Sequence, residues 1–94
     1  YLAQAAMLAA GIKGIEEKME LAPPTKGDVY EDAKAQDIPQ TLRAATETLR
    51  GSKMLRAAMG DDVVDHYTRA ARWEQEEFDR VVTDWEIARG FERA

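Results

Sequence analysis

The chain has 94 residues, of which 45% are hydrophobic and 33% charged, and its formal net charge at pH 7 is −5. This length allows one domain at most, and because sixteen residues are alanine, the core can only be small. A complete nucleotide-dependent enzyme, with a phosphate-binding loop and a substrate pocket, needs a larger scaffold. Acidic and basic residues occur in both halves, so no basic face for nucleic acid is predicted.

The chain contains no cysteine, which excludes disulfide bonds, thiolate metal ligands and a cysteine nucleophile, and which fits a reducing, cytoplasmic location. Its most apolar stretch, residues 1–12, is too short to span a bilayer, and no basic residues precede it as in a signal peptide. Because the sequence does not begin with Met, we expect it to be part of a longer protein.

Residues 1–21 are predicted to form one helix. Leu2, Ala5, Ala9 and Ile12 recur at helical spacing, and a second row of small side chains lies beside them. The first half has almost no polar residues, whereas the part from Lys13 onward suits a helix that meets water. Lys13 could form a surface ion pair with Glu17, four positions further on. We expect a half-buried helix, covered by other elements on more than one side.

Residues 22–39 are predicted to be a connector, because two consecutive prolines at 23 and 24 stop the helix. Val29, Tyr30 and Ile38 are its apolar points and could pin it to a larger body.

Four further helices are predicted, over residues 41–50, 53–59, 62–82 and 84–92. Thr41, Ser52 and Asp61 are the expected N-caps of the first three, and Thr83 with Glu86 forms the pattern of a capping box. Apolar residues spaced along the long helix, from Val64 to Val82, should form its inner face. No segment reads as a strand, so the predicted class is all-α, in one segment of 94 residues.

Two clusters could suggest chemistry, and both have simpler explanations. Asp62 and His66 lie four apart on one helical face, but two ligands do not make a metal site, and acidic residues favour the start of a helix. Acidic residues at 74, 76, 77 and 79 are more simply a solvated helix face, with Glu76 expected to pair with Arg72 and Arg80. We therefore predict no catalytic, cofactor-binding or metal-binding residue in this chain.

Three large aromatic residues near the end of the chain, Trp73, Trp85 and Phe91, have few apolar neighbours in sequence to cover them. They could fill a small local core, or they could form contacts in a larger assembly. Trp85 and Phe91 are the candidate interface residues.

The opening residues 1–16, Tyr-Leu-Ala-Gln-Ala-Ala-Met-Leu-Ala-Ala-Gly-Ile-Lys-Gly-Ile-Glu, resemble the helix that follows the Asn-Pro-Tyr-Leu-Ala motif of bacterial glutamine synthetases. Further segments agree in order: Gly-Asp-Val-Tyr at 27–30, Ile-Pro at 38–39, the stretch 54–61, and 73–78 followed by Val-Thr-Asp-Trp-Glu at 82–86. The ending is similar to that of type I glutamine synthetases and of their relatives that join glutamate to amines.

This resemblance implies the helical C-terminal portion of the α+β catalytic domain of an ATP-dependent ligase. Such a ligase joins glutamate to ammonia or an amine through a γ-glutamyl phosphate, with Mg²⁺ or Mn²⁺, in a cytoplasmic dodecamer of two rings. The family's metal, ATP and glutamate ligands precede the matched region, so the 94-residue chain alone should be inactive and should supply packing and subunit contacts.

Tyr30 stands where some type I enzymes carry an adenylylated tyrosine, which makes it a candidate modification site, although Glu31-Asp32-Ala33 replaces the family's Leu-Pro-Pro.

The alternative is a stand-alone helical interaction or scaffold module without catalysis. The two hypotheses differ in the sequence that should precede Tyr1 in the parent.

Overall fold

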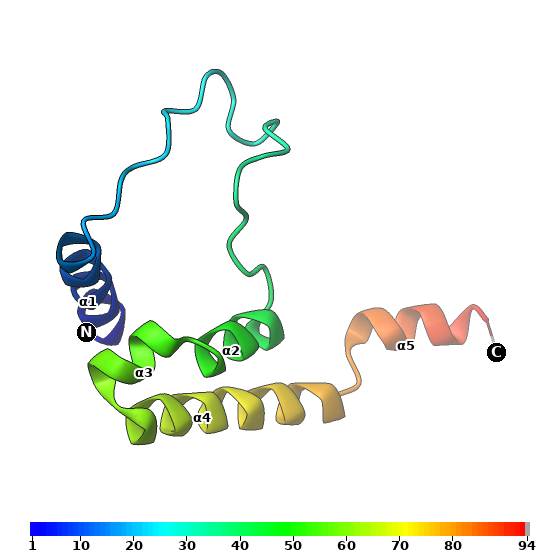
Figure 1. Cartoon of the computed structure of the whole chain (residues 1–94). Helices are drawn as coiled ribbons and strands as arrows, with labels where there is room; N and C mark the ends of the chain where they lie inside the picture. Colours follow the sequence, from blue (N-terminus) through cyan, green and yellow to red (C-terminus); the bar gives the residue numbers. More distant parts are fainter. Residues whose placement is uncertain (94) are drawn as a thin grey trace.

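The computed structural model describes residues 1–93 and contains five α-helices. They are α1 (Leu2–Glu16), α2 (Leu42–Arg50), α3 (Lys53–Met59), α4 (Asp61–Arg80) and α5 (Asp84–Phe91) (Figure 1). No residue among the described 93 lies in a strand. The all-α prediction is therefore confirmed.

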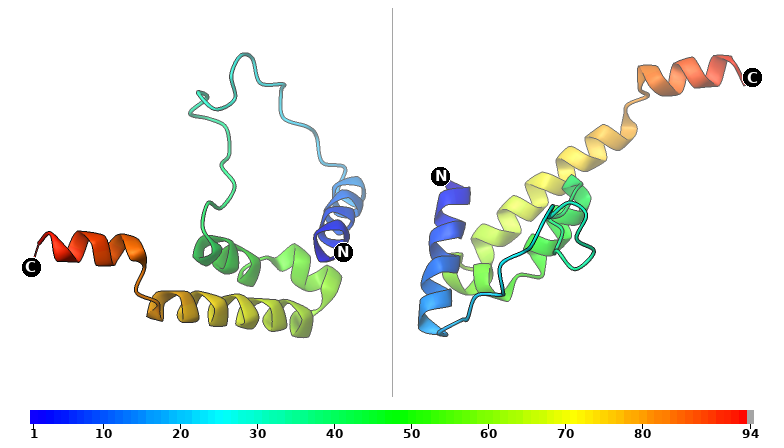
Figure 2. Two further views of the ribbon diagram at one scale, coloured as in Figure 1. Left: turned by 180° about the vertical axis from the view of Figure 1, so that it is seen from behind. Right: turned by 90° about the horizontal axis from the view of Figure 1, so that it is seen from above.

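The centre of the structure is the α2–α3–α4 unit, in which α2 and α3 both pack along α4 (Figure 2). Val64 of α4 is 2% exposed and is the one buried hydrophobic side chain among the described residues. The other two buried side chains are Thr46 of α2 and Thr68 of α4. Each hydroxyl donates to a carbonyl of its own helix, to Leu42 at 2.7 Å and to Asp65 at 3.1 Å, so neither is left unpaired.

Hydroxyl side chains start three of the helices, as the sequence predicts. Thr41 Oγ1 accepts from the Ala44 amide at 3.1 Å, and Ser52 Oγ accepts from the Leu55 amide at 3.2 Å. At α5, Thr83 and Glu86 form the reciprocal capping box. These caps pair amides that the first turn of a helix otherwise leaves free.

The predicted start and end of the long helix are wrong. Asp61 is the first residue of α4 and not its N-cap, which is Gly60 at φ 89°. The helix ends at Arg80, two residues before the predicted end, because Val81 takes an extended conformation. The Asp61 carboxylate is therefore free to accept from Arg56 rather than from its own helix.

The first helix also ends earlier than predicted, at Glu16 instead of residue 21. Its end is a Schellman motif: the Met19 amide donates to the Gly14 carbonyl at 2.9 Å, and the Lys18 amide to the Ile15 carbonyl at 3.1 Å. Lys18 has φ 50°, in the left-handed region that usually favours glycine. The end was missed because Lys18 stands where glycine would mark it.

The expectation of a half-buried first helix is wrong for this chain taken alone. No side chain of α1 is buried. The main contact of α1 with another helix is the one with α3. Leu8 and Ile15 remain in water although they are as apolar as any core residue. The sequence predicted that other elements would cover α1 on more than one side. In the structure α1 is covered mainly on the side that packs on α3.

The connector between α1 and α2 loops away from the helices (Figure 1). It runs from the end of α1 to Thr41, longer than the predicted 22–39. Near its tip, the side chains of Asp28 and Asp32 accept from the amides of Tyr30 and Lys34, each at 2.9 Å. These local turns give the segment a shape without packing it on the helices.

The described part of the chain is extended, with dimensions of 60 × 41 × 20 Å and a radius of gyration of 18.7 Å. A compact domain of this length would have a radius of about 12 Å. The helix α5 projects from the end of α4 as an arm, and it lacks the packing that joins the other four helices (Figure 2).

Candidate functional site

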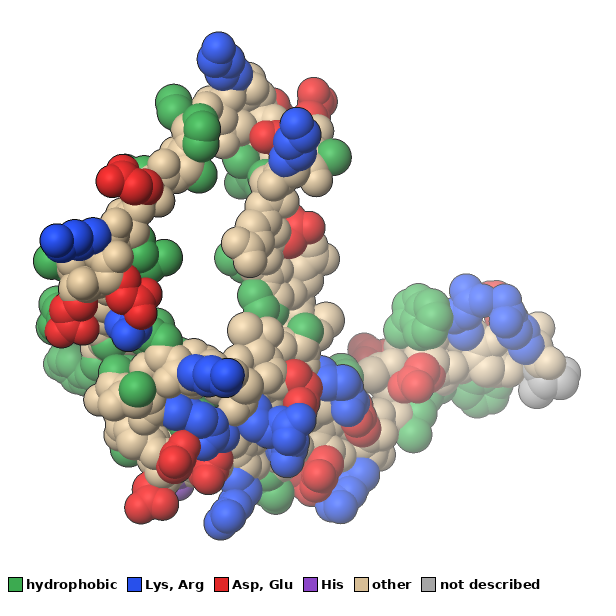
Figure 3. Space-filling view, viewed as in Figure 1, with side chains coloured by type: hydrophobic (Ala, Val, Ile, Leu, Met, Phe, Trp, Pro, Cys, Tyr) green, Lys and Arg blue, Asp and Glu red, His purple; other side chains and the backbone are tan. Residues whose placement is uncertain are grey.

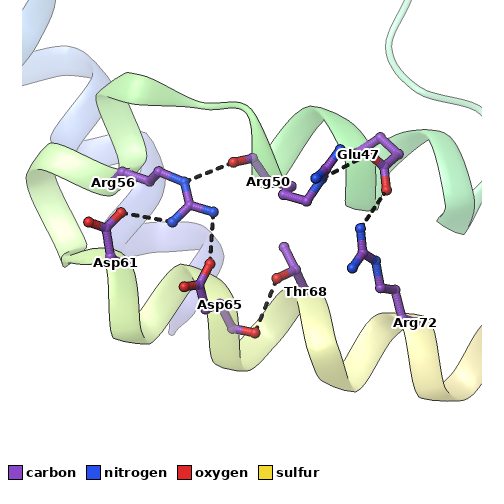
Figure 4. Close-up of polar contacts among 7 residues, drawn as sticks. All are labelled: Glu47, Arg50, Arg56, Asp61, Asp65, Thr68 and Arg72. Atoms are coloured by element: carbon purple, nitrogen blue, oxygen red, sulfur yellow. Dashed lines mark hydrogen bonds and ion pairs between the residues drawn. The ribbon is translucent and has the colours of Figure 1, made fainter.

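The most connected polar side chain in the described structure is Arg56 of α3, which makes three hydrogen bonds to the two neighbouring helices, α2 and α4 (Figure 4). Its Nε donates to the carbonyl of Arg50, at the end of α2, at 2.8 Å. Its two terminal nitrogens donate to carboxylates of α4, to Asp61 and to Asp65, each at 2.8 Å. The hydrogen bonds to Asp61 and then Asp65 raise the pKa of Arg56.

Arg56 thus fixes the corner at which α2, α3 and α4 meet. Sequence reasoning did not identify it, because its partners lie five and nine positions ahead, across the turn between two helices. The helical spacings of three and four residues could not reveal that pairing. Its role here is structural, since each of its hydrogen bonds satisfies a group of the same three helices.

A second set of ion pairs joins α2 to α4. Glu47 of α2 contacts Arg72 of α4 at 3.1 Å, and it also contacts Arg50 of its own helix at 2.7 Å (Figure 4). Arg43 of α2 contacts Asp79 of α4 at 2.7 Å. The hydrogen bond from Arg72, followed by that from Arg50, lowers the pKa of the Glu47 carboxyl. These side chains are about half exposed, so each pair contributes little by itself.

The ion pairs predicted for Glu76 are wrong. Arg72 turns to Glu47 on the neighbouring helix, and Arg80 contacts Glu77 at 2.6 Å. Spacing along one helix could not anticipate a carboxylate supplied by another. The predicted pair between Lys13 and Glu17 is confirmed at 2.7 Å.

The two residues weighed as metal ligands, Asp62 and His66, lie on the exposed surface of α4. The His66 ring meets the ring of Tyr67 edge-on, with 5.3 Å between the centroids. Among residues 1–93, no three potential ligands of the histidine, aspartate or glutamate type gather at one point.

An apolar groove of about 190 Å³ lies between α1 and the α2–α3–α4 unit. Its walls include Leu2 and Ala6 of α1, Leu49 of α2, Met59 of α3 and Tyr67 of α4. On the α1 side the groove is lined by Leu2 and by the small side chains of Ala3 and Ala6. It marks an incompletely filled contact between α1 and the rest of the chain.

The exposed apolar surface is the second notable feature of the chain. It covers much of α1, whereas charged side chains gather over α2, α3 and α4 (Figure 3). On α5, Trp85 is 67% exposed and Phe91 82%. The Arg89 guanidinium lies 4.9 Å from the centre of the Trp85 ring. Trp73 is exposed as well, so none of the three aromatic residues fills a local core. Their role in an interface stays a prediction.

Tyr30, the candidate modification site, lies on the turn near the tip of the connector and is 96% exposed. Its backbone is held by the hydrogen bond to Asp28 described above, while its phenol projects into solvent. Modification of Tyr30 stays a prediction.

No helix of the part that the structure describes combines the length and the apolar character needed to cross a membrane.

Much of the apolar surface of these helices is not covered by other parts of the same chain. Sequence comparison identifies the class of protein to which the chain belongs. Residues 1–90 match the family of the glutamine synthetase catalytic domain. The chain therefore belongs to the glutamine synthetase family, and its all-helical structure is consistent with a helical portion of that catalytic domain.

Among individual relatives, the chain is 48% identical to the γ-glutamylethanolamide synthetase of Streptomyces coelicolor, over 99% of this chain and 20% of the relative. It is 36% identical to the glutamine synthetase of Thermus thermophilus and 34% identical to that of Methanosarcina mazei, each over 95% of this chain and 22% of the relative. The chain thus spans about a fifth of the length of these relatives.

Proposed function

We propose that this chain is the helical C-terminal part of an ATP-dependent ligase that joins glutamate to ammonia or to an amine. In the parent protein the reaction would pass through a γ-glutamyl phosphate. The chain itself supplies packing behind the active site and contacts between subunits, and it is inactive alone. The relatives are ligases by name, and the match covers nearly the whole chain, which supports this assignment.

One observation carries the packing role: a family match over residues 1–90 coincides with a structure in which Val64 is the one buried hydrophobic side chain described. A surface that leaves most of α1 in water is costly, because each exposed apolar side chain forgoes about 1.5–3 kcal/mol of burial energy. We infer that the remainder of the catalytic domain covers α1 and that α5, with Trp85 and Phe91, contacts another subunit.

The other properties of the parent follow from the family resemblance. ATP and Mg²⁺ or Mn²⁺ would bind to residues outside this chain, because the resemblance places the family's metal and ATP ligands before the region that this chain matches. The parent would be a cytoplasmic homo-oligomer, with twelve subunits in two rings. Tyr30 would be accessible to an adenylylating enzyme, because its phenol is exposed at the tip of the connector.

The names of the relatives support an order in which to test the possible acceptors. Identity is 48% to a relative named for ethanolamide synthesis and 34% and 36% to two relatives named glutamine synthetase. We propose a small primary amine such as ethanolamine as the first acceptor to test, with ammonia second.

The test is an assay of phosphate release by the full-length parent, supplied with glutamate, ATP and Mg²⁺. Ethanolamine, polyamines and ammonia are compared as acceptors, with a reaction lacking glutamate as the control. Phosphate release that depends on both glutamate and an acceptor is expected. Absence of release with every acceptor would refute the ligase assignment.

The packing role is tested separately, on the isolated 94-residue chain, by circular dichroism during heating and by sedimentation. We expect a broad, weakly cooperative transition or self-association through the exposed apolar faces. A sharp transition of a monomer would instead support a stand-alone helical interaction module.

A further inference from the structure

We draw no further inference here: the strongest candidate, the exposed apolar surface of the α5 arm around Trp85 and Phe91, already belongs to the proposed subunit contact, and nothing in the structure shows what covers it.

Discussion

The α2–α3–α4 unit and the helix α1 use their apolar residues in opposite ways. α1 is the most apolar of the long helices, yet none of its side chains is buried. α4 is rich in charged residues, yet it provides the buried Val64 and Thr68. Burial in this chain therefore follows from the presence of a neighbouring helix and not from apolar content.

The same contrast separates α4 from α5, although they are adjacent in sequence. α4 lies in ion-paired contact with α2 through Arg72 and Arg43, whereas α5 is held chiefly by its own capping box. The central unit is stabilised by contacts between helices, and the arm by contacts within one helix. Variants in the two regions should therefore differ in how far their effects spread.

The largest effect is expected from Leu8→Asp in the full-length parent. If the rest of the catalytic domain covers the outer face of α1, the variant must bury an unpaired carboxylate at a cost of several kcal/mol. We expect at least a tenfold loss of assembled, active protein, measured by sedimentation and phosphate release.

Two controls accompany Leu8→Asp. The variant Leu8→Met conserves the apolar character and should behave as the wild type. In the isolated chain Leu8 is exposed, so Leu8→Asp should leave the helical dichroism nearly unchanged. A parent that assembles normally with aspartate at this position would show that this face of α1 stays in water.

The next largest effect is expected inside the central unit. Val64→Ala removes two buried methyl groups and should lower the local stability of α4 by about 2 kcal/mol. That loss corresponds to roughly thirtyfold faster amide hydrogen exchange in the first half of α4. The matched variant Val82→Ala, at an exposed position beyond the end of α4, should change exchange little. Equal effects of the two variants would contradict the contrast between the central unit and the exposed segment that follows it.

A smaller and more local effect is expected at the start of α5. Thr83→Ala removes the hydroxyl that accepts from the Glu86 amide and should destabilise α5 by about 1 kcal/mol. Exchange of the Glu86 and Ile87 amides should accelerate, while the amides of α4 should not respond. Thr83→Ser keeps the hydroxyl and serves as the control. Acceleration in α4 would mean that the arm is coupled to the central unit.

The end of α1 offers a stabilising substitution. Lys18→Gly relieves the left-handed conformation at φ 50° and should stabilise the last turn by about 0.5–1 kcal/mol, partly offset by the greater freedom of the unfolded chain. Slower exchange of the Met19 amide, which closes the turn, is the measurement. Lys18→Ala also removes the charge but keeps the strain, and it should give no such slowing.

The smallest expected effect is a loss of helix stability at acidic pH. The pKa of Glu47 is lowered by Arg72 and Arg50, and that of Glu86 by its bonds to Thr83. A lowered folded-state pKa means that the stabilisation is complete above the ordinary value of about 4.5 and is lost as the pH falls through the lower folded value. Helical dichroism should therefore be constant from pH 7 to about 5 and decline below.

The variant Glu47→Gln separates the two regions in this acid titration. It removes one of the two ion-paired carboxylates between α2 and α4, Asp79 being the other, while leaving the capping box of α5 intact. The acid-induced loss of protection in α2 should shrink, and that in α5 should persist. An unchanged acid response of α2 would show that Glu47 does not link the two helices in solution.

The sequence predicted those parts of the structure that depend on a few neighbouring residues. The caps at Thr41 and Ser52 and the box at Thr83 each complete their bonds within three residues, so residue type and spacing suffice to find them. The end of α1 escaped prediction because its closing turn uses lysine instead of glycine. The order of residues at 1–16 and 82–86 also sufficed to suggest the family that the comparison identifies.

The tertiary structure alone decided which side chains meet across helices. Arg56 reaches Asp61 and Asp65, and Glu47 takes Arg72, only because turns bring separate helices together. The burial of Val64 and the exposure of α1 have the same origin. Apolar periodicity says that a helix has a face to cover, but a neighbour must be present in space to cover it, and here α4 has such neighbours while most of α1 does not.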